Sequence, residues 1–304
     1  MHIGIDLGGT KTEIIVLSSQ KQEVYRKREA TDKKSYQQVL QQLTRLVREA
    51  ELELSADCTI GIGIPGTLSP DHGNVKNANS TVLIGHPLDR DLEALLHRPV
   101  KIANDADCFT LSEAIDGAGS GAQSVFGVIL GTGVGGGIVI NNTILDGPNR
   151  ICGEWGHNPL PWPTHLDLPA RACYCGKSAC IETYLSGPAL EHQYQGLTAQ
   201  TSPTEAQVIA ALATSGNAEA QQVLEAYCHR LAKALASVIN ILDPEVIVLG
   251  GGLSNIQKLY DEVPEQLQRF VFSDSLNTKL LPNRYGDSSG VRGAAWLGMA
   301  GKVN

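Results

Sequence analysis

Near the start of the chain an acid, two glycines, a threonine and a lysine stand together in the run Asp6-Leu7-Gly8-Gly9-Thr10-Lys11. Apolar residues flank this run, so residues 3–17 are expected to form a β-hairpin with a tight glycine turn. Such a turn leaves backbone N–H groups uncovered and can approach a phosphate, while Asp6 can hold a metal ion directly or through water. An ordinary hairpin without a ligand would use the same glycines. The run leaves both interpretations open, but it is not a Walker loop.

Glycines also follow two later apolar strands, in the segments Gly131–Gly137 and Gly250–Gly252. Ligands of α/β sheets usually bind beyond the carboxyl ends of strands. Three such loops could surround one nucleotide, with two at the phosphates and one at the adenosine. Phosphoryl transfer needs little more, since it depends on positioning and charge neutralisation.

The pair Asn104-Asp105 follows an apolar strand at residues 100–103. Asp105 could be the general base that accepts the proton of a substrate hydroxyl. Aspartate is also a common helix N-cap, and position alone favours that role.

Three cysteines and a histidine have the spacing of a metal site: Cys173, Cys175 and Cys180 lie within eight residues, and His157 lies upstream. Four nitrogen and sulfur ligands fit a closed tetrahedral zinc site, which leaves no position for a reactive water and implies a structural role. A loop of free thiols is the alternative, although clustered cysteines in a cytosolic chain favour metal.

Two glutamates, Glu154 and Glu182, flank the proposed ligands. A structural zinc would fix both carboxylates in space, and carboxylates accept hydrogen bonds from sugar hydroxyls well. Solvated surface acids would be equally consistent with the sequence.

The elements that must position these residues follow an α/β pattern. Strands are expected at 59–64, 124–130, 137–140 and 245–249, and helices at 36–50, 89–97 (with Leu92, Leu95 and Leu96 inward), 105–118, 218–242 and 290–300. The order strand, glycine–threonine turn, strand occurs at both residues 3–17 and 124–140. It predicts two related halves that face each other across a cleft, while two unrelated hairpins remain the alternative.

Composition narrows the class of protein. The chain has 304 residues and a formal charge of −8, which argues against a general nucleic-acid binder. It lacks the apolar run of a membrane span and the pattern of a signal peptide, so a cytoplasmic location is expected. Its seven cysteines are an odd number, and in a reducing compartment they favour thiols or metal over disulfides.

Taken together, these motifs resemble the ROK family of sugar kinases, in the superfamily that includes actin and the heat-shock ATPases. The resemblance covers essentially the whole chain and is carried by Asp6-Leu7-Gly8-Gly9-Thr10-Lys11, Gly63-Ile64-Pro65-Gly66, Asn104-Asp105-Ala106, Leu130-Gly131-Thr132-Gly133-Val134-Gly135-Gly136-Gly137, Gly153-Glu154-Trp155-Gly156-His157, Cys173-Tyr174-Cys175-Gly176, Cys180-Ile181-Glu182 and Gly250-Gly251-Gly252. The chain looks closest to bacterial fructokinases in Trp155, in Tyr174 and in the runs Lys76-Asn77-Ala78-Asn79-Ser80 and His157-Asn158-Pro159-Leu160-Pro161-Trp162. Ala179 departs from the family, which usually has glycine there, and puts the turn of the zinc loop in doubt.

The resemblance implies an α/β, two-domain, actin-like (RNase H-like) ATPase fold with a cleft between the domains. Residues 1–117 and a C-terminal helix at 288–304 would form the small domain, and 118–287 the large domain with the zinc loop. It also implies an ATP-dependent transfer of phosphate to a hexose, most plainly D-fructose to fructose 6-phosphate, with Asp105 as the base. N-acetylglucosamine, glucose or mannose kinases are the nearest alternative, and a ROK-type repressor is disfavoured because the hairpin begins at Ile3 and leaves no room for a helix-turn-helix.

The implied site residues form three groups. ATP would meet Gly4, Ile5, Asp6, Leu7, Gly8, Gly9, Thr10, Lys11, Gly131, Thr132, Gly133, Val134, Gly135, Gly136, Gly137, Gly250, Gly251 and Gly252, with Mg²⁺ at Asp6. The sugar would meet Gly66, Asn79, Asn104, Asp105, Glu154, His157 and Glu182. Structural Zn²⁺ would be held by His157, Cys173, Cys175 and Cys180, with one ring nitrogen of His157 on zinc and the other toward the sugar. The family also suggests a homodimer, with no membrane or nucleic-acid partner; the preferred hexose and the oligomeric state are not fixed by the sequence.

Overall fold

The computed structural model describes residues 1–78 and 80–299. By its internal contacts the chain divides into two compact units. The first unit comprises residues 1–121, 137–152 and those from 287 onward, and the second unit comprises residues 122–136 and 153–286. The predicted domain limits at residues 117 and 288 stay a prediction.

The first unit is built on a five-stranded sheet in the order β3-β2-β1-β4-β7. Its strands are β1 (His2–Leu7), β2 (Lys11–Leu17), β3 (Glu23–Ala30), β4 (Thr59–Ile64) and β7 (Val100–Asn104). β1 pairs antiparallel with β2 and parallel with β4, and β4 pairs parallel with β7. The predicted hairpin is confirmed, and the parallel strands bring the carboxyl ends of β1, β4 and β7 to one edge.

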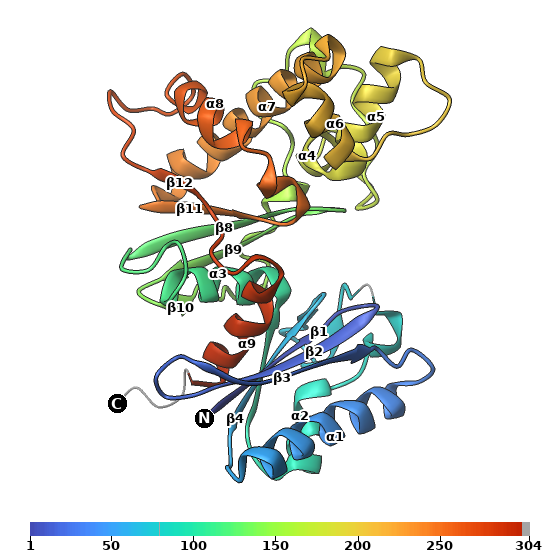
Figure 1. Cartoon of the computed structure of the whole chain (residues 1–304), viewed down its shortest axis with the longest axis vertical. Coiled ribbons are helices and arrows are strands. Elements are labelled where there is room, and N and C mark those ends of the chain that lie inside the picture. Colours follow the sequence, from blue (N-terminus) through green and yellow to red (C-terminus); the bar gives the residue numbers. More distant parts are fainter. Residues whose placement is uncertain (79, 300–304) are drawn as a thin grey trace. The chain divides into compact units, whose positions relative to one another are not determined.

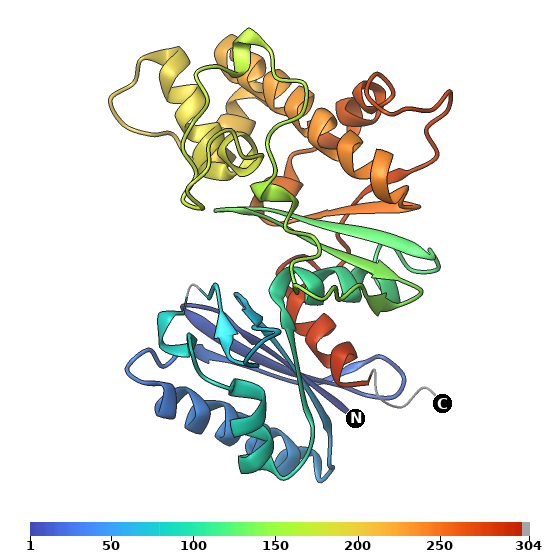
Figure 2. The ribbon, with the colours of Figure 1, turned by 180° about the vertical axis from the view of Figure 1, so that it is seen from behind.

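Helices α1 (Tyr36–Leu54) and α2 (Leu88–Leu96) cover one face of this sheet (Figure 2). Ser35 caps α1 by accepting a hydrogen bond from the Gln38 N–H. Apolar residues of both helices and of the strands form one buried cluster, which includes Leu92. Leu95, predicted to point inward, is 41% exposed, because the short helix turns only one apolar stripe to the sheet.

The other face carries α9 (Ser289–Met299), which also packs against α3 (Asp105–Ile115) (Figure 1). Glycine makes this close approach possible. A Cβ on Gly4 would lie 2.5 Å from the Ala295 nitrogen, and a Cβ on Gly61 would lie 2.8 Å from the Gly298 nitrogen. Gly293 packs in the same way onto the carbonyl oxygen of Cys108. The C-terminal helix therefore lies directly on the backbone of strands from the other end of the chain.

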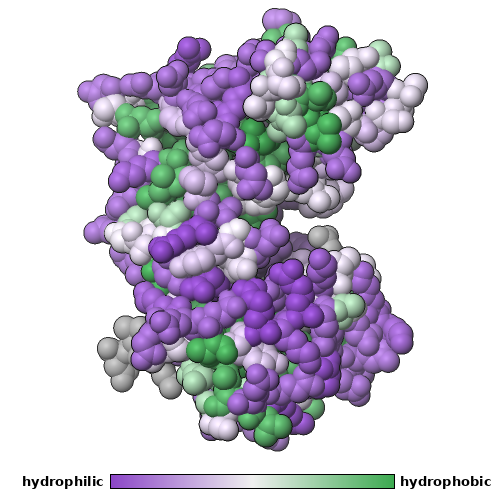
Figure 3. Space-filling model, in the orientation of Figure 1, coloured by the Kyte–Doolittle hydropathy of each residue, from purple (hydrophilic) through white to green (hydrophobic). Residues whose placement is uncertain are grey.

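The outermost strand, β3, presents charged side chains. Arg26 and Arg28 pair with Glu13, while Lys27 and Arg45 pair with acids of α1 and β3. Figure 3 shows a largely hydrophilic surface over this part of the sheet. Within the described residues, no helix is both long and apolar enough to cross a membrane.

The second five-stranded sheet repeats the plan of the first, in the order β10-β9-β8-β11-β12. Its strands are β8 (Ser124–Leu130), β9 (Val134–Ile140), β10 (Thr143–Ile144), β11 (Val246–Gly250) and β12 (Lys279–Pro282). β11 pairs parallel with both β8 and β12, as β4 does with β1 and β7. The predicted duplication is confirmed in the strand order. β9 begins three residues earlier than predicted, because the glycines at 135–136 continue the strand.

Helices α4 (Glu182–Leu185), α5 (Gly187–Thr198), α6 (Ala206–Thr214), α7 (Ala218–Leu242) and α8 (Lys258–Leu267) gather in the second unit (Figure 1). α7 is central and contacts α4, α5, α6 and α8. It ends where predicted, at Asp243, whose backbone is left-handed. The short elements β5 (Thr67–Leu68), β6 (Val75–Lys76) and the single turns at 81–83, 155–157, 165–167, 252–255 and 286–288 complete the fold.

Candidate functional site

The first glycine turn joins β1 to β2 and is tied to the chain beyond β3. Gly8 donates its N–H to the carbonyl oxygen of Lys11 over 3.0 Å, and the Thr31 hydroxyl donates to the carbonyl oxygen of Gly8 over 2.7 Å. A Cβ on Gly8 would lie 2.9 Å from the Lys11 oxygen, so a larger residue would open the turn. The turn is thus held closed, with glycine required at its first position.

Asp6 precedes this turn and lies among acids of the first unit. Burial and the neighbouring charges of Asp105 and Glu13 raise the pKa of Asp6 to about 7, while Arg28 opposes the shift. Glu13 is the register partner of Asp6 on β2 and is itself buried between Arg26 and Arg28. A divalent cation would neutralise this crowding, so the Asp6 carboxylate fits the predicted role of holding Mg²⁺.

Asn104 and Asp105 stand where β7 passes into α3. Asn104 is the N-cap and accepts a hydrogen bond from the Ala106 N–H over 2.8 Å, while its own amide donates to the Gly66 carbonyl oxygen over 3.2 Å. Asp105 is the first helical residue, and its carboxylate also accepts from the Ala106 N–H. Position alone favoured Asp105 as the cap, but Asn104 takes that role. Gly66, Asn104 and Asp105 therefore form one contiguous group.

The second glycine loop, Gly131–Gly133, joins β8 to β9. Gly131 donates to the Gly133 oxygen over 3.0 Å, and Val134 donates its N–H to the carboxylate of Glu182 over 2.9 Å. Gly133 also requires glycine, because a Cβ there would lie 2.7 Å from the same Glu182 oxygen. Glu182 was predicted to face the sugar, and one of its two carboxylate oxygens accepts a hydrogen bond from this loop.

The third glycine run follows β11. Gly251 has a φ of +81°, and a Cβ there would lie 2.5 Å from the carbonyl oxygen of Leu130. Close packing against the end of β8 explains this glycine without a ligand. Likewise Gly4 faces α9, and Gly137 lies against the Thr110 hydroxyl of α3. Contact of these positions with ATP stays a prediction.

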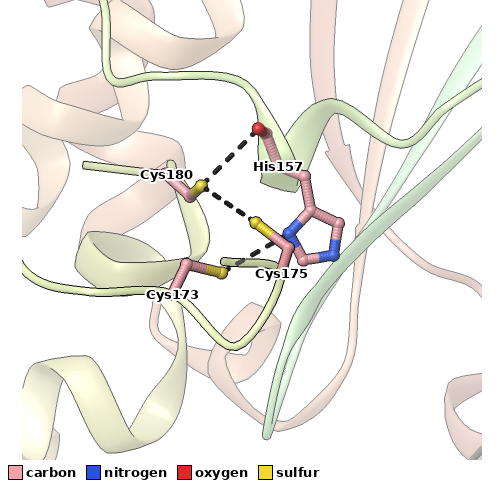
Figure 4. Close-up of side chains that lie close together, drawn as sticks. All are labelled: His157, Cys173, Cys175 and Cys180. Carbon is pink, nitrogen blue, oxygen red and sulfur yellow. Dashed lines mark hydrogen bonds between the residues drawn. The ribbon is translucent and has the colours of Figure 1, made fainter. Parts of the chain in front are cut away.

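His157, Cys173, Cys175 and Cys180 converge in the second unit (Figure 4). Their ligand atoms all lie within 4.8 Å of one another. The Cys173 sulfur is 3.6 Å from Nδ1 of His157, and the sulfurs of Cys175 and Cys180 are 3.6 Å apart. A tetrahedral zinc with Zn–S distances of about 2.3 Å would place its ligands about 3.5–3.8 Å apart, so the four residues fit that ion.

The second ring nitrogen of His157, Nε2, lies 3.0 Å from the Tyr174 hydroxyl. The two rings meet edge to face, with centroids 5.1 Å apart. Burial raises the pKa of Tyr174, as do the charges of Glu182 and Glu154. His157 was predicted to turn one ring nitrogen to the sugar, and that contact stays a prediction. In this structure the nitrogen meets the Tyr174 hydroxyl, a contact that the sequence analysis did not predict. Glu154 is exposed beside this group.

A buried ion cluster anchors the segment between His157 and Cys173. Asp167 contacts Nε of Arg230 over 2.7 Å and Nζ of Lys233 over 3.1 Å, and all three side chains are at most 10% exposed. Burial alone would raise the pKa of Asp167, but the Thr164 N–H, Arg230 and Lys233 outweigh it and hold the pKa well below its ordinary value. The sequence signal was two cations, three residues apart, within the apolar helix α7.

The structure thus brings the predicted residues together in two sets. The first unit contains Gly66, Asn104, Asp105, Asp6 and the first glycine turn. The second unit contains residues 131–136 of the second glycine run, the third glycine run, Glu154, Glu182 and the metal ligands. Asn79, predicted to contact the sugar, lies outside the described residues, as do residues 300–304 of the predicted C-terminal helix.

Two sheets of one topology, each with a glycine-turned hairpin, define the two-domain α/β fold of sugar kinases and actin-like ATPases. Solved structures agree. A ROK hexokinase from Thermus thermophilus matches with a TM-score of 0.85 and 30% identity over 97% of both chains. A ROK family glucokinase from Streptomyces griseus, in complex with glucose and AMPPNP, matches with a TM-score of 0.78 and 26% identity over 99% of both chains. The predicted fold class is confirmed.

Sequence comparison names the family. The ROK family model matches residues 2–300. An N-acetyl-D-glucosamine kinase from Yersinia pseudotuberculosis is 41% identical over 99% of this chain and 100% of its own length, and one from Escherichia coli is 40% identical over 98% and 99%. The chain belongs to the ROK family.

Proposed function

We propose that this ROK-family sugar kinase transfers the γ-phosphate of ATP to a hydroxyl of N-acetyl-D-glucosamine. The observation that carries the proposal is the similarity to kinases of that name over the full length of the chain. It replaces fructose, the first expectation, with the alternative that the sequence already offered. Fructose now rests only on the short sequence features that resemble fructokinases, such as Trp155 and Tyr174.

The first unit supplies the chemistry. Asp105 would accept the proton of the sugar hydroxyl as its oxygen attacks the γ-phosphorus and the bond from that phosphorus to the β–γ bridging oxygen breaks, which releases ADP. Asn104, held by Gly66 and by the cap of α3, fixes the backbone from which Asp105 projects. Asp6 would hold Mg²⁺, which neutralises phosphate charge when bound. His157, Glu154 and Glu182 are proposed to contact the sugar.

Zinc is the metal we propose for the Cys/His group. Three thiolates and one imidazole are soft ligands at tetrahedral spacing, and they favour Zn²⁺ over Mg²⁺ or Ca²⁺. Elemental analysis of purified protein should find about one zinc per chain, as a closed four-ligand site requires. A fully active protein free of zinc would contradict this part.

A coupled assay of ADP formation tests the substrate. We expect kcat/KM for N-acetyl-D-glucosamine to exceed those for glucose, mannose and fructose by at least about tenfold, because a site that hydrogen-bonds an acetamido group leaves polar groups unpaired with a sugar that lacks it. A preference for fructose would overturn the choice of sugar and leave the kinase intact. The predicted homodimer stays a prediction that light scattering can test.

A further inference from the structure

The second glycine loop is gripped from two sides by the chain segments that lead to and from the metal ligands. For this inference the loop is taken as residues 131–136. Residues 155 and 156 immediately precede the ligand His157, and residues 182–187 follow the ligand Cys180. All these residues belong to the second unit.

On the first side, Trp155 is 4% exposed and donates its indole N–H to the carbonyl oxygen of Gly135 over 2.9 Å. Its ring lies edge to face on Phe126 of β8, with centroids 5.6 Å apart. Gly156 packs onto Val134 so closely that a Cβ would lie 3.2 Å from the Val134 Cβ. Trp155 is therefore held between the loop and β8, the strand that leads into it, and Gly156 packs on Val134.

On the second side, the Glu182 carboxylate accepts the Val134 N–H over 2.9 Å, and Gly187 donates its N–H to the Gly131 oxygen over 2.8 Å. The other oxygen of Glu182 lies 4.0 Å from the sulfur of Cys173, a metal ligand. These contacts fix Gly131 and Val134 of the loop from the segment that follows Cys180.

We infer that the metal site is a clamp that sets the shape of the second glycine loop, with Trp155 and Glu182 as its positioning residues. His157 and Cys180 are 23 residues apart, and one ion bound to both would hold the two gripping segments at a fixed separation. The inference rests on the proposed function for one point only, that the loop meets the phosphates of ATP.

Hydrogen exchange on the whole protein tests the clamp without an activity readout. Removal of the metal by a chelator should speed exchange of the amides in residues 131–136 by about tenfold or more, because those amides then open locally. Exchange in the first glycine turn, residues 7–12, should not change, and this shows that the protein remains folded. Faster exchange confined to residues 173–180 would overturn the inference.

If the metal-free protein does not fold, a substitution in the metal-loaded protein can test whether the segments beside the metal ligands set the shape of the loop. Trp155→Phe keeps an aromatic ring but removes the donor to Gly135. We expect the KM for ATP to rise about fivefold or more, with the zinc content and the KM for the sugar within twofold of the wild type. The control is Trp162→Phe, since Trp162 is 49% exposed and stacks on Phe270. An unchanged KM for ATP in Trp155→Phe would contradict the inference.

Glu182 gives a conservative rescue. Glu182→Ala should raise the KM for ATP, and Glu182→Gln should restore it, because an amide oxygen still accepts the Val134 N–H. If both variants change only the KM for the sugar, Glu182 does not position the loop. If nucleotide binds nowhere while metal removal still loosens residues 131–136, the proposed function fails and the clamp stands.

Discussion

The two glycine-turned hairpins share one topology but are built with different chemistry. The first, between β1 and β2, lies beside the acids Asp6, Glu13 and Asp105. The second, between β8 and β9, has no acid in its strands and is gripped by residues on either side of a Cys/His metal site. The first hairpin therefore gathers acidic side chains, and the second is held in shape by hydrogen bonds from neighbouring segments.

This difference shows how a duplicated framework can divide labour. Phosphoryl transfer needs a base and a cation at one place and rigid backbone donors at another. In the proposed function, Asp105 would be the base and Asp6 would hold the cation; burial and the neighbouring acids raise the pKa of Asp6. In the proposed function, the second hairpin would supply the backbone donors, and Trp155 and Glu182, which flank the proposed metal ligands, would hold its shape.

The largest effect is expected from a substitution of Asp105, which lies beside the first hairpin. Asp105→Asn should lower kcat by about a thousandfold or more, because a positioned general base contributes about 10²–10⁴. Binding of ATP analogue and sugar should change by less than about threefold. Steady-state kinetics and calorimetry measure the two quantities.

Asp107→Asn, on the same turn of α3, is the matched control and should keep most of the activity. If Asp105→Asn turned over at the wild-type rate, the charged hairpin would have no base beside it, and the contrast between the hairpins would collapse.

The next largest effect concerns the buried ion cluster of Asp167, Arg230 and Lys233, which anchors the segment between the metal ligands His157 and Cys173. Asp167→Asn should lower the free energy of unfolding at pH 7 by about 3 kcal/mol or more, because Arg230 and Lys233 would remain buried without their carboxylate. Urea unfolding measures the difference. Asp146→Asn is the control; its pair with Arg150 is 3.8 Å long and exposed, so the loss should be below about 0.5 kcal/mol.

The difference in the free energy of unfolding between the wild type and Asp167→Asn should depend on pH. The pKa of Asp167 is lowered in the folded state, so its contribution is present above the ordinary value of 3.8 and is lost as the pH falls below that value. The wild type and Asp167→Asn should therefore converge in strongly acidic, chelator-containing buffer, in which neither carries metal. A difference that grew on acidification would show that Asp167 is not ionised.

The smallest effect sharpens the account of the metal loop. Ala179 has a φ of +60°, a backbone conformation that glycine adopts more readily. Ala179→Gly should raise the thermal stability by the equivalent of up to about 1 kcal/mol. Ala172 forms an isolated antiparallel β-bridge with Ser178, next to Ala179. The control Ala172→Gly should lower the thermal stability. Calorimetry that found Ala179→Gly less stable would mean that the turn is not strained.

Much of the fold was predictable because its elements have clear apolar patterns and sharp ends. β4, β8 and α7 have the bounds that the sequence predicted, since proline, glycine or aspartate closes each one. Helices α5, α6 and α8 were not predicted. The apolar residues of α6 are mostly small alanines, and α8 contains Pro264, which hides its period.

The site divides in the same way. The Cys/His cluster was predictable because its cysteines lie close together in the sequence. Glu13 was not, although an acid beside the apolar run Ile14-Ile15-Val16-Leu17 is unusual. Asp167 was not either, because its partners lie 63 and 66 residues away and only packing brings them together. The role of Ala179 needed the backbone angle, which no residue pattern gives.

Because α9 packs directly on the backbone of Gly4 and Gly61, the first sheet cannot be completed until the end of the chain has been synthesised. The ribosome begins α9 225 residues after the end of β4, since β4 ends at Ile64 and α9 starts at Ser289. At about 5–20 residues per second this is a delay of about 11–45 seconds. During that interval one face of the first sheet lacks its helix, and the glycine-lined backbone there is uncovered. The nascent first unit is therefore expected to recruit chaperones until its last helix emerges, whereas the second unit, residues 122–136 and 153–286, is complete before α9 is made.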